Sequence, residues 1–249
     1  MTDQSPENSQ FFLTAAMPCP YLEGREERKL FTHLSGRRAS MLHHVLNEHG
    51  FRRSQNLIYR PACDGCSACR SVRIPAHDFT AGGRHRRILR RNQDIIGTQL
   101  SPRVSAEQYD LFKLYLETRH EGGGMTQMSY MDYEYMVEDT PVNSVLIEYR
   151  LAQSDGTTGP LVAVALSDLM DEGLSMVYSF FDPSHAARGL GNFMILDHIR
   201  RVIDSGLKYV YLGYWVPNSP KMAYKASFQP LEVQSGTAGW QRLDIVQAD

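Results

Sequence analysis

Four cysteines within the first 70 residues are the side chains best suited to hold a metal. Cys19 stands alone, and the other three form the pattern Cys63-x-x-Cys66-x-x-Cys69 with small residues between them. Four thiolates can hold a zinc ion or ligate an iron–sulfur cluster. Free cysteines can also be small buried residues. The spacing therefore predicts a metal-binding or redox-active group and leaves zinc and iron–sulfur equally open.

A run of arginines follows the cysteines. Residues 84–91 read RHRRILRR, and no acidic residue occurs between Asp78 and Asp94. On a helix, side chains four residues apart are neighbours, so this run would form a basic surface suited to phosphate groups of a nucleic acid. A solvated basic helix is the alternative. The predicted phosphate-binding residues are Arg84, Arg86, Arg87, Arg90 and Arg91.

The stretch from residue 161 to residue 230 is predicted to organise the rest of the chain. Two apolar runs, 161–166 and 174–181, flank a turn-forming segment and indicate a hairpin. A glycine-containing turn, 188–191, then precedes a helical pattern, and an aromatic and β-branched run at 209–216 indicates a further strand. This order predicts a β-α-β crossover. Its helix would present free N–H groups at Gly191, where a ligand can approach closely.

The turn has the spacing Arg188-x-x-Gly191, which resembles the acyl-donor loop of GNAT-type acyltransferases. Phe193 stands where that pattern has a small residue that admits a pyrophosphate. Coenzyme A is therefore not the expected donor. The alternative is that the glycines only close a tight turn.

Composition places the chain among water-soluble globular proteins. It has 249 residues, enough for one large or two modest domains, and 42% are hydrophobic while 22% are charged. No apolar run reaches membrane-spanning length, and the first ten residues are polar and acidic without the pattern of a signal peptide. We therefore expect a cytoplasmic protein.

Charge is distributed unevenly along the chain. Residues 1–100 contain 15 Lys/Arg and 9 Asp/Glu, whereas residues 101–249 contain 11 and 19. The basic first part favours contact with a polyanion, and the acidic remainder argues against nucleic acid covering the whole surface.

Three further helices are predicted at residues 26–33, 39–49 and 106–120, and a strand begins at residue 144. Adjacent histidines, His43 and His44, cannot share one face of a helix and are predicted to be surface residues.

Many short motifs, in the same order, resemble the bacterial aspartate/glutamate leucyltransferases, relatives of the eukaryotic arginyl-tRNA–protein transferases. The similarity runs from about residue 12 to about residue 243. It is carried by Cys19-Pro20-Tyr21-Leu22, Tyr59-Arg60-Pro61 with the three following cysteines, residues 87–92, Arg119-His120, Phe180-Phe181-Asp182-Pro183, Leu190-Gly191, Gly213-Tyr214-Trp215 and residues 221–225.

The resemblance implies an α+β fold in two domains. A polar tail would occupy residues 1–10, a cysteine-bearing α/β domain with the basic run residues 11–100, and a GNAT-like domain with a mixed sheet and flanking helices residues 101–249. It also implies transfer of leucine from leucyl-tRNA to an N-terminal Asp or Glu, which marks the modified protein for degradation. In the eukaryotic relatives the N-terminal cysteines are linked to an iron–sulfur cluster.

Two residues are predicted to be catalytic under this resemblance. Asp168, at the end of an apolar strand, would hold the substrate's α-amine or accept its proton; opening the turn before Gly173 is the alternative. Tyr214, with Trp215, would line the aminoacyl pocket or stack on the terminal adenosine of the tRNA. Packing within the sheet is the alternative for both aromatic residues.

The predicted site needs cations for the 3′ end of the tRNA and for the acidic side chain of the substrate. Lys221 and Lys225, four residues apart around Tyr224, could bind the 3′ end of the tRNA, because an anion between them would relieve their repulsion. The acidic substrate side chain also demands a cation, and the sequence does not choose among four candidates. These are Arg52, Arg53, Arg60 and Arg119.

The reaction is attack of a neutral amine on an ester. An α-amino group has a pKa of about 8, so neither a strong base nor a cofactor is required for the chemistry. The expected partners are leucyl-tRNA and proteins that begin with Asp or Glu, with no membrane and no DNA. The alternatives are an arginyl-tRNA–protein transferase, a coenzyme A-dependent acetyltransferase and a non-catalytic tRNA-binding protein.

Overall fold

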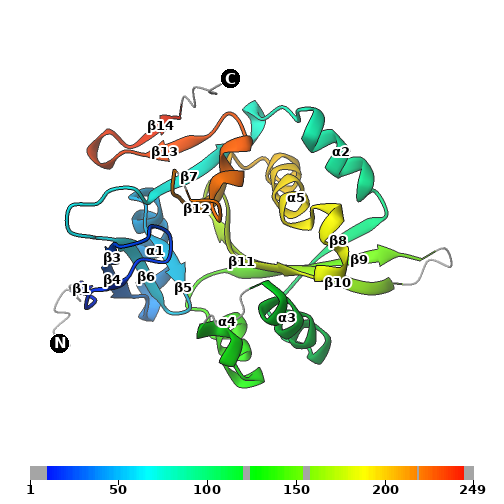
Figure 1. Ribbon diagram of the computed structural model, residues 1–249, viewed down its shortest axis with the longest axis horizontal. Coiled ribbons are helices and arrows are strands. Elements are labelled where there is room, and N and C mark those ends of the chain that lie inside the picture. Colours follow the sequence, from blue (N-terminus) through cyan, green and yellow to red (C-terminus); the bar gives the residue numbers. More distant parts are fainter. Residues whose placement is uncertain (1–9, 120–123, 154–157, 218, 244–249) are drawn as a thin grey trace, which may run out of the picture.

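The structure, a computed structural model, describes residues 10–119, 124–153, 158–217 and 219–243. Its centre is an eight-stranded sheet with the strand order β14-β13-β7-β12-β11-β10-β9-β8 (Figure 1). The strands β11 and β12 are parallel, and the other neighbours are antiparallel. The bounds are β7 Arg70–Pro75, β8 Ile95–Leu100, β9 Ser144–Ala152, β10 Thr158–Met170, β11 Gly173–Phe181, β12 Tyr209–Trp215, β13 Glu232–Gln234 and β14 Trp240–Arg242.

The predicted crossover lies in the middle of this sheet. β10 and β11 form the predicted hairpin, with Met170 opposite Gly173. The helix α5 (Leu190–Asp204) then connects β11 to the parallel strand β12. α5 buries a broad apolar face, because its hydrophobic residues recur at helical spacing. Gly206, with a φ of +69°, follows the helix end as predicted.

Helices cover both faces of the large sheet (Figure 1). On one face lie α5 and the arginine-rich helix α2 (Gly83–Arg91), which contact each other. On the other face lie α3 (Ala106–Arg119) and α4 (Tyr130–Glu138). Each pair of helices shares a hydrophobic core with the strands it covers. Residues 161–166 of the central strand β10 are accordingly buried throughout.

A smaller sheet and the helix α1 (Ala39–Glu48) form the N-terminal part. The sheet has the order β1-β4-β6-β5, with β1 Phe12–Leu13, β4 Lys29–His33, β6 Leu57–Pro61 and β5 Arg52–Ser54. The short strands β2 (Met17–Pro18) and β3 (Glu26–Glu27) pair beside it. Short 3-10 helices are η1 Gly36–Arg38, η2 Ala76–Asp78, η3 Gly124–Gln127, η4 Pro183–Arg188, η5 Ala223–Ser227 and η6 Gly236–Ala238.

Two sequence predictions about the N-terminal part are wrong. Residues 26–33 form β3 and β4 rather than a helix, because Phe31 and Thr32 pair with Tyr59 and Ile58 of β6. His43 is fully buried rather than on the surface, since α1 turns it toward the large sheet. The helices predicted at 39–49 and 106–120 are present as α1 and α3.

The large sheet crosses the boundary that was predicted at residue 100. β7 inserts between β12 and β13, and β8 pairs with β9 over six positions. The α+β class, with a mixed sheet and flanking helices, is confirmed. The predicted tail lies almost wholly outside the described residues. In the described part of the chain, no helix is both long enough and apolar enough to cross a membrane.

Candidate active site between two diverging parallel strands

The strands β11 and β12 pair for only part of their length. Their register covers Gly173–Ser175 opposite Tyr209–Tyr211 and then stops. We call the unpaired remainders, residues 176–181 of β11 and 212–215 of β12, the strand fork. Residues 176–179 are half-buried although β11 is a central strand. The two parallel strands in the middle of the sheet thus separate beyond Ser175 and Tyr211.

A β-bulge in β11 lies at the base of the fork. Leu166 of β10 pairs with Tyr178, whereas the next residue, Ser167, pairs with Met176. Val177 is therefore the additional residue, and a bulge of this kind bends the strand and changes the direction of its backbone groups. The bulge places backbone N–H groups where the two strands diverge.

Arg52, from β5 of the small sheet, spans the base of the fork. Its guanidinium donates to Ser175 Oγ at 3.0 Å and to the carbonyl of Met176, both on β11. On the β12 side it lies against Gly213, where an added Cβ would be 2.7 Å from Arg52 Nε. Gly213 also has a φ of +77°. Glycine at this position thus lets the guanidinium pack flat against the strand.

Lys225, from η5, reaches the same part of β12. Its ammonium group donates to the carbonyls of Leu212 at 2.9 Å and Tyr214 at 2.6 Å. Burial and, to a smaller extent, the positive charge of Arg52 together lower the pKa of Lys225 to about 7. Two buried basic side chains therefore lie close to Gly213.

The mouth of the fork lies at the N-terminus of α5. Gly189 precedes this helix in the left-handed conformation, and no side chain caps the helix. The first helical hydrogen bond is donated by Phe193, so the N–H groups of residues 190–192 have no partner within the helix. The position of a Cβ on Gly191 would be 3.8 Å from the ring of Phe181 at the end of β11. The helix end therefore faces the fork.

The arginine-rich helix α2 packs directly against this helix end. Ile88 lies 3.6 Å from the Cβ position of Gly189, and Asn92 donates to the carbonyl of Arg188 at 3.0 Å. The opposite side of α2 is exposed and carries Arg84, Arg86, Arg87, Arg90 and Arg91. Among the described residues, none of these five arginines forms an ion pair. A basic surface thus borders the mouth of the fork.

The cysteines gather at a different place. Cys19, Cys63, Cys66 and Cys69 line one pocket of about 60 Å³ together with Tyr59 and Tyr214. Burial, followed by the neighbouring cysteines, raises the pKa of Cys69 to about 11. Cys63 Sγ accepts from the backbone N–H of Arg28 at 3.4 Å. The donor set suits a thiolate-bound metal, but no three His, Cys, Asp or Glu side chains of the described residues are arranged to hold one.

Comparison with known proteins identifies the family. Residues 17–87 match the family described as "Arginine-tRNA-protein transferase, N terminus", and residues 107–235 match "Arginine-tRNA-protein transferase, C terminus". The chain belongs to this transferase family. The matched segments contain the cysteines, the start of α2, both arms of the fork and α5.

Named relatives extend over the whole chain. An aspartate/glutamate leucyltransferase of Azorhizobium caulinodans is 53% identical over 98% of this chain and 100% of its own length. The enzyme of the same name from Bradyrhizobium diazoefficiens is also 53% identical, over 98% and 96% of the two chains. Among solved structures, the C-terminal domain of a putative lysylphosphatidylglycerol synthetase from Agrobacterium fabrum matches at a TM-score of 0.49 and 14% identity, covering 69% of this chain and 61% of its own.

Asp168, predicted to contact the substrate amine of this transferase, is fully buried. Its two oxygens accept from Arg53 at 2.6 and 2.7 Å, and Ser144 Oγ donates to it at 2.7 Å. His43 Nε2 lies 3.4 Å from the same carboxylate. Asp168 and Arg53 thus join the small sheet to the large one. In this arrangement the Asp168 carboxylate is occupied by Arg53 and Ser144, and the Arg53 guanidinium is paired with Asp168.

The aromatic residues of β12 lie within the sheet. The Tyr214 hydroxyl lies 3.0 Å from the carbonyl of Gly50 and 2.9 Å from that of Tyr59, on the cysteine side. Trp215 is 8% exposed, and the guanidinium of Arg70 lies 5.1 Å from its ring centre. These positions agree with the alternative of sheet packing.

The remaining predicted residues lie apart from one another. Arg119 is exposed near the mouth of the fork, 5.8 Å from the ring centre of Phe181. Arg60 is exposed over the ring of Phe51. Lys221 is exposed whereas Lys225 is buried, so the two lysines do not form the expected pair. Tyr224 is 40% exposed beside Lys225.

Sequence reasoning missed the bulge at Val177 and did not separate Arg52 from the other three candidate arginines. A bulge has no residue signature of its own in an apolar strand. The sequence shows Arg52 and Arg53 side by side, and in a strand neighbouring side chains point to opposite faces. That Arg53 meets Asp168 while Arg52 meets the fork depends on how the two sheets pack.

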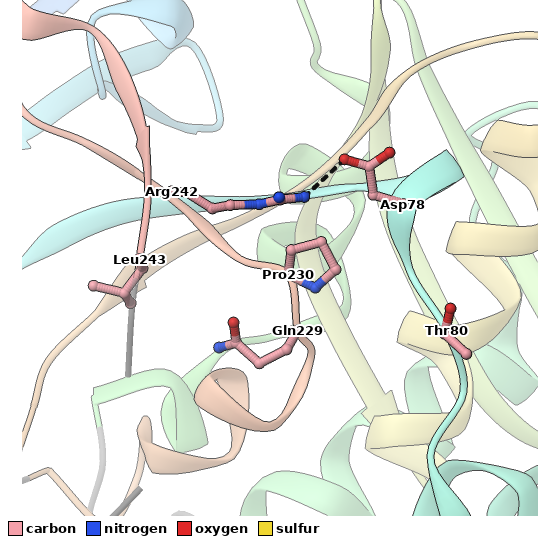
Figure 2. Close-up of a pocket in the computed structure, with 6 residues that line it drawn as sticks. All are labelled: Asp78, Thr80, Gln229, Pro230, Arg242 and Leu243. Atoms are coloured by element: carbon pink, nitrogen blue, oxygen red, sulfur yellow. Dashed lines mark hydrogen bonds and ion pairs between the residues drawn. The ribbon is translucent and has the colours of Figure 1, made fainter. Parts of the chain in front are cut away.

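A cleft of about 430 Å³ lies away from these residues. It is lined by η2, the segment after η5 and β14, and Arg242 reaches across it to Asp78 at 2.9 Å (Figure 2). None of the predicted site residues lines this cleft.

Proposed function

We propose that the protein transfers leucine from leucyl-tRNA to the α-amine of proteins whose first residue is Asp or Glu. The names of the 53% identical relatives support this substrate pair. The position of α2 is the observation that supports binding of the tRNA. The exposed arginines of this helix border the N-terminus of α5, which faces the strand fork. The resulting N-terminal leucine would mark the product for degradation in the cytoplasm.

The tRNA would lie along α2, with its aminoacyl end in the mouth of the fork. Phosphate contacts position a nucleic acid without reading its sequence, which suits arginines on an exposed helix face. The free N–H groups of residues 190–192 and the uncapped start of α5 favour negative charge. Arg119 and Lys221 lie exposed and are proposed to contact the same tRNA end.

The chemical step would be aminolysis of an ester. The neutral α-amine attacks the leucyl carbonyl carbon, a C–N bond forms, and the bond to the ribose oxygen breaks. The amine loses a proton and the ribose hydroxyl gains one, so the products are a leucyl peptide and free tRNA. Backbone N–H groups at the Val177 bulge are proposed to stabilise the oxyanion, as fixed donors do in acyl transfer.

Asp168 and Tyr214 are proposed to act through other residues. Asp168 holds Arg53, next to Arg52 in β5, and Tyr214 holds β12 against the small sheet. Both would fix the width of the fork at its base. Alignment of amine and ester can supply much of the acceleration in such a reaction.

The four cysteines are proposed to bind a zinc ion or an iron–sulfur cluster. Cys19, Cys63, Cys66 and Cys69 would be the ligands, and the chemistry of the transfer does not pass through this group. Metal analysis and absorbance spectra of protein purified without oxygen would identify it. A chain with one thiol pair oxidised and no bound metal would contradict this part of the proposal.

The decisive test of the function is a transfer assay with separated components. The purified chain is incubated with leucyl-tRNA, arginyl-tRNA or acetyl-coenzyme A and a peptide that begins with Asp. We expect a leucylated peptide only with leucyl-tRNA. Arginine transfer would identify the arginyl enzyme, acetylation would identify a coenzyme A enzyme, and tRNA binding without product would indicate a non-catalytic protein.

A further inference from the structure

Arg52 and Lys225 are buried basic side chains, and neither donates a hydrogen bond to a carboxylate of the described residues. Arg52 is 8% exposed and Lys225 is 6% exposed. Their acceptors are a hydroxyl and three backbone carbonyls, all uncharged. Arg53, the neighbour of Arg52, shows the contrast, because Asp168 neutralises it. Charged side chains are almost never buried unless they are paired, so the fork lacks a negative charge.

Both cations keep unused donors. A guanidinium has five N–H groups, and the contacts of Arg52 within the described residues account for two of them. An ammonium has three, and Leu212 and Tyr214 account for two on Lys225. The free donors belong to groups that both lie close to Gly213. This combination suits a carboxylate, which can accept from both at once.

We propose that Arg52 and Lys225 together bind the side-chain carboxylate of the substrate's N-terminal Asp or Glu and so determine which proteins are modified. This inference rests on the proposed function and assigns the part of the site that reads the acidic residue. The α-amine of the same residue then lies toward the Val177 bulge, between the carboxylate and the aminoacyl end of the tRNA.

A peptide side chain fits this position better than a phosphate of the tRNA. The two cations are 6–8% exposed at the base of the fork, whereas the α2 arginines are exposed at its mouth. A carboxylate on one or two methylenes can enter between two strands, and a sugar–phosphate chain is much bulkier. The remaining candidates also fit less well, because Arg53 is paired and Arg60 lies exposed on Phe51.

Binding of a carboxylate should change the protonation of Lys225. The groups that face its ammonium are the carbonyls of Leu212 and Tyr214, the guanidinium of Arg52 and the ring of Tyr224. The free pKa is about 7, so at pH 8 most of the lysine is uncharged. A bound carboxylate favours the charged form and raises this pKa. Acidic peptides should therefore bind with uptake of a proton at pH 8.

The experiment compares peptides that differ only in their first residue, Asp or Asn. Transfer from leucyl-tRNA is measured for the wild type and for Arg52→Gln and Lys225→Met. We expect kcat/KM for the Asp peptide to fall about 100-fold in each variant, because a site built for a charged group loses its partner. The value for the Asn peptide should change less than about threefold, and Arg52→Lys should recover part of the loss. The KM for leucyl-tRNA should stay constant.

Matched controls come from the surface. Arg103→Gln and Lys208→Met remove the same side-chain types from exposed ion pairs and should leave both peptides unaffected. Thermal unfolding shows whether each variant folds. Both site variants should fold, because neither substitution leaves a buried carboxylate without its counter-charge.

Calorimetry without tRNA separates this inference from the proposed function. An Asp peptide should bind the wild type with proton uptake at pH 8, and the Asn peptide should not, whether or not leucine is transferred. Transfer with an unchanged preference for Asp in both folded variants would overturn the assignment. A rise in the KM for leucyl-tRNA alone would also overturn it and would place these cations on the tRNA.

Discussion

Asp168 is the residue whose carboxylate joins the large sheet to the small one. It accepts two hydrogen bonds from Arg53 in an ion pair that is fully buried. Asp168→Asn would leave the Arg53 cation without its partner, and we expect the free energy of unfolding to fall by about 3–5 kcal/mol. Chemical denaturation measures this loss. Asp171→Asn is the control, because Asp171 is exposed and pairs with the half-buried His44, and an equal loss there would contradict the account.

Buried histidines should make the protein sensitive to mild acid. Burial lowers the pKa of His43 and of His198 to about 4, so both are neutral in the native state. In the unfolded chain they titrate near pH 6.5. Between pH 6.5 and about 4 the unfolded chain therefore binds protons that the native state does not. Stability should fall as the pH falls through this range, by up to about 3 kcal/mol for each histidine.

Denaturation at several pH values tests this prediction. His198 bridges Ser167 Oγ and the carbonyl of Met194. A His198→Asn variant that still folds should show a smaller slope, because one titrating group is gone. An unchanged slope would show that His198 is already charged in the native state.

Short-range sequence patterns could be recognised from residue types, whereas the burial and contacts of individual residues could not. The cysteine spacing, the arginine run and the glycines of the turn were evident from the sequence, because each depends on short-range pattern. The burial of His43 and the occupation of Asp168 were not evident. Both depend on contacts between residues more than 100 positions apart.

The helix α2 is the element that we propose binds the tRNA. Its sequence predicted a helix with arginines on one side, and α2 spans Gly83–Arg91 with the arginines exposed. Arg87→Glu with Arg90→Glu should raise the KM for leucyl-tRNA about tenfold or more and reduce its salt dependence, since two phosphate contacts are lost. Transfer rates at several salt concentrations measure both.

A charge reversal elsewhere controls for net charge. Arg37→Glu changes an exposed arginine of η1 and should leave the KM for tRNA almost unchanged. Equal effects of the α2 and η1 variants would contradict a specific role for α2.

A substitution at Gly213 of β12 tests whether Arg52 packs against this strand. Gly213→Ala should cost about 2 kcal/mol or more, because Ala disfavours a φ of +77° and its Cβ would collide with the guanidinium. Gly206→Ala is a matched control with a φ of +69° and nothing within 4 Å. Gly206→Ala should lower stability less and leave the Asp preference intact. Equal effects of the two substitutions on that preference would contradict the packing of Arg52 on β12.

The position of α2 beside the fork could not be predicted. Helical periodicity identifies the buried face of α2, but Asn92 meets Arg188 across 96 residues of sequence. The crossover itself was predictable, because its strands, glycine turn and helix follow one another directly. The divergence of β11 and β12 was not, since Arg52, which contacts both strands at that point, comes from β5 of the small sheet.

At the scale of the whole molecule, the large sheet makes the two predicted domains interdependent. A fragment of residues 101–249 lacks α2, β8 and β7, and β12 loses its neighbour on one side. We expect this fragment to show no cooperative unfolding transition, whereas the full chain should show one. Circular dichroism during heating compares the two. A fragment that unfolds cooperatively would support the boundary at residue 100.

The central claim is that the fork brings a tRNA-borne leucyl ester to the amine of an acidic N-terminal residue. Mass spectrometry of an Asp-beginning peptide, incubated with the purified chain and leucyl-tRNA, tests this most directly. The account predicts addition of one leucyl group to the N-terminus, at a rate that falls when Arg87 and Arg90 are reversed in charge. An unmodified peptide in the presence of folded protein and intact leucyl-tRNA would contradict it.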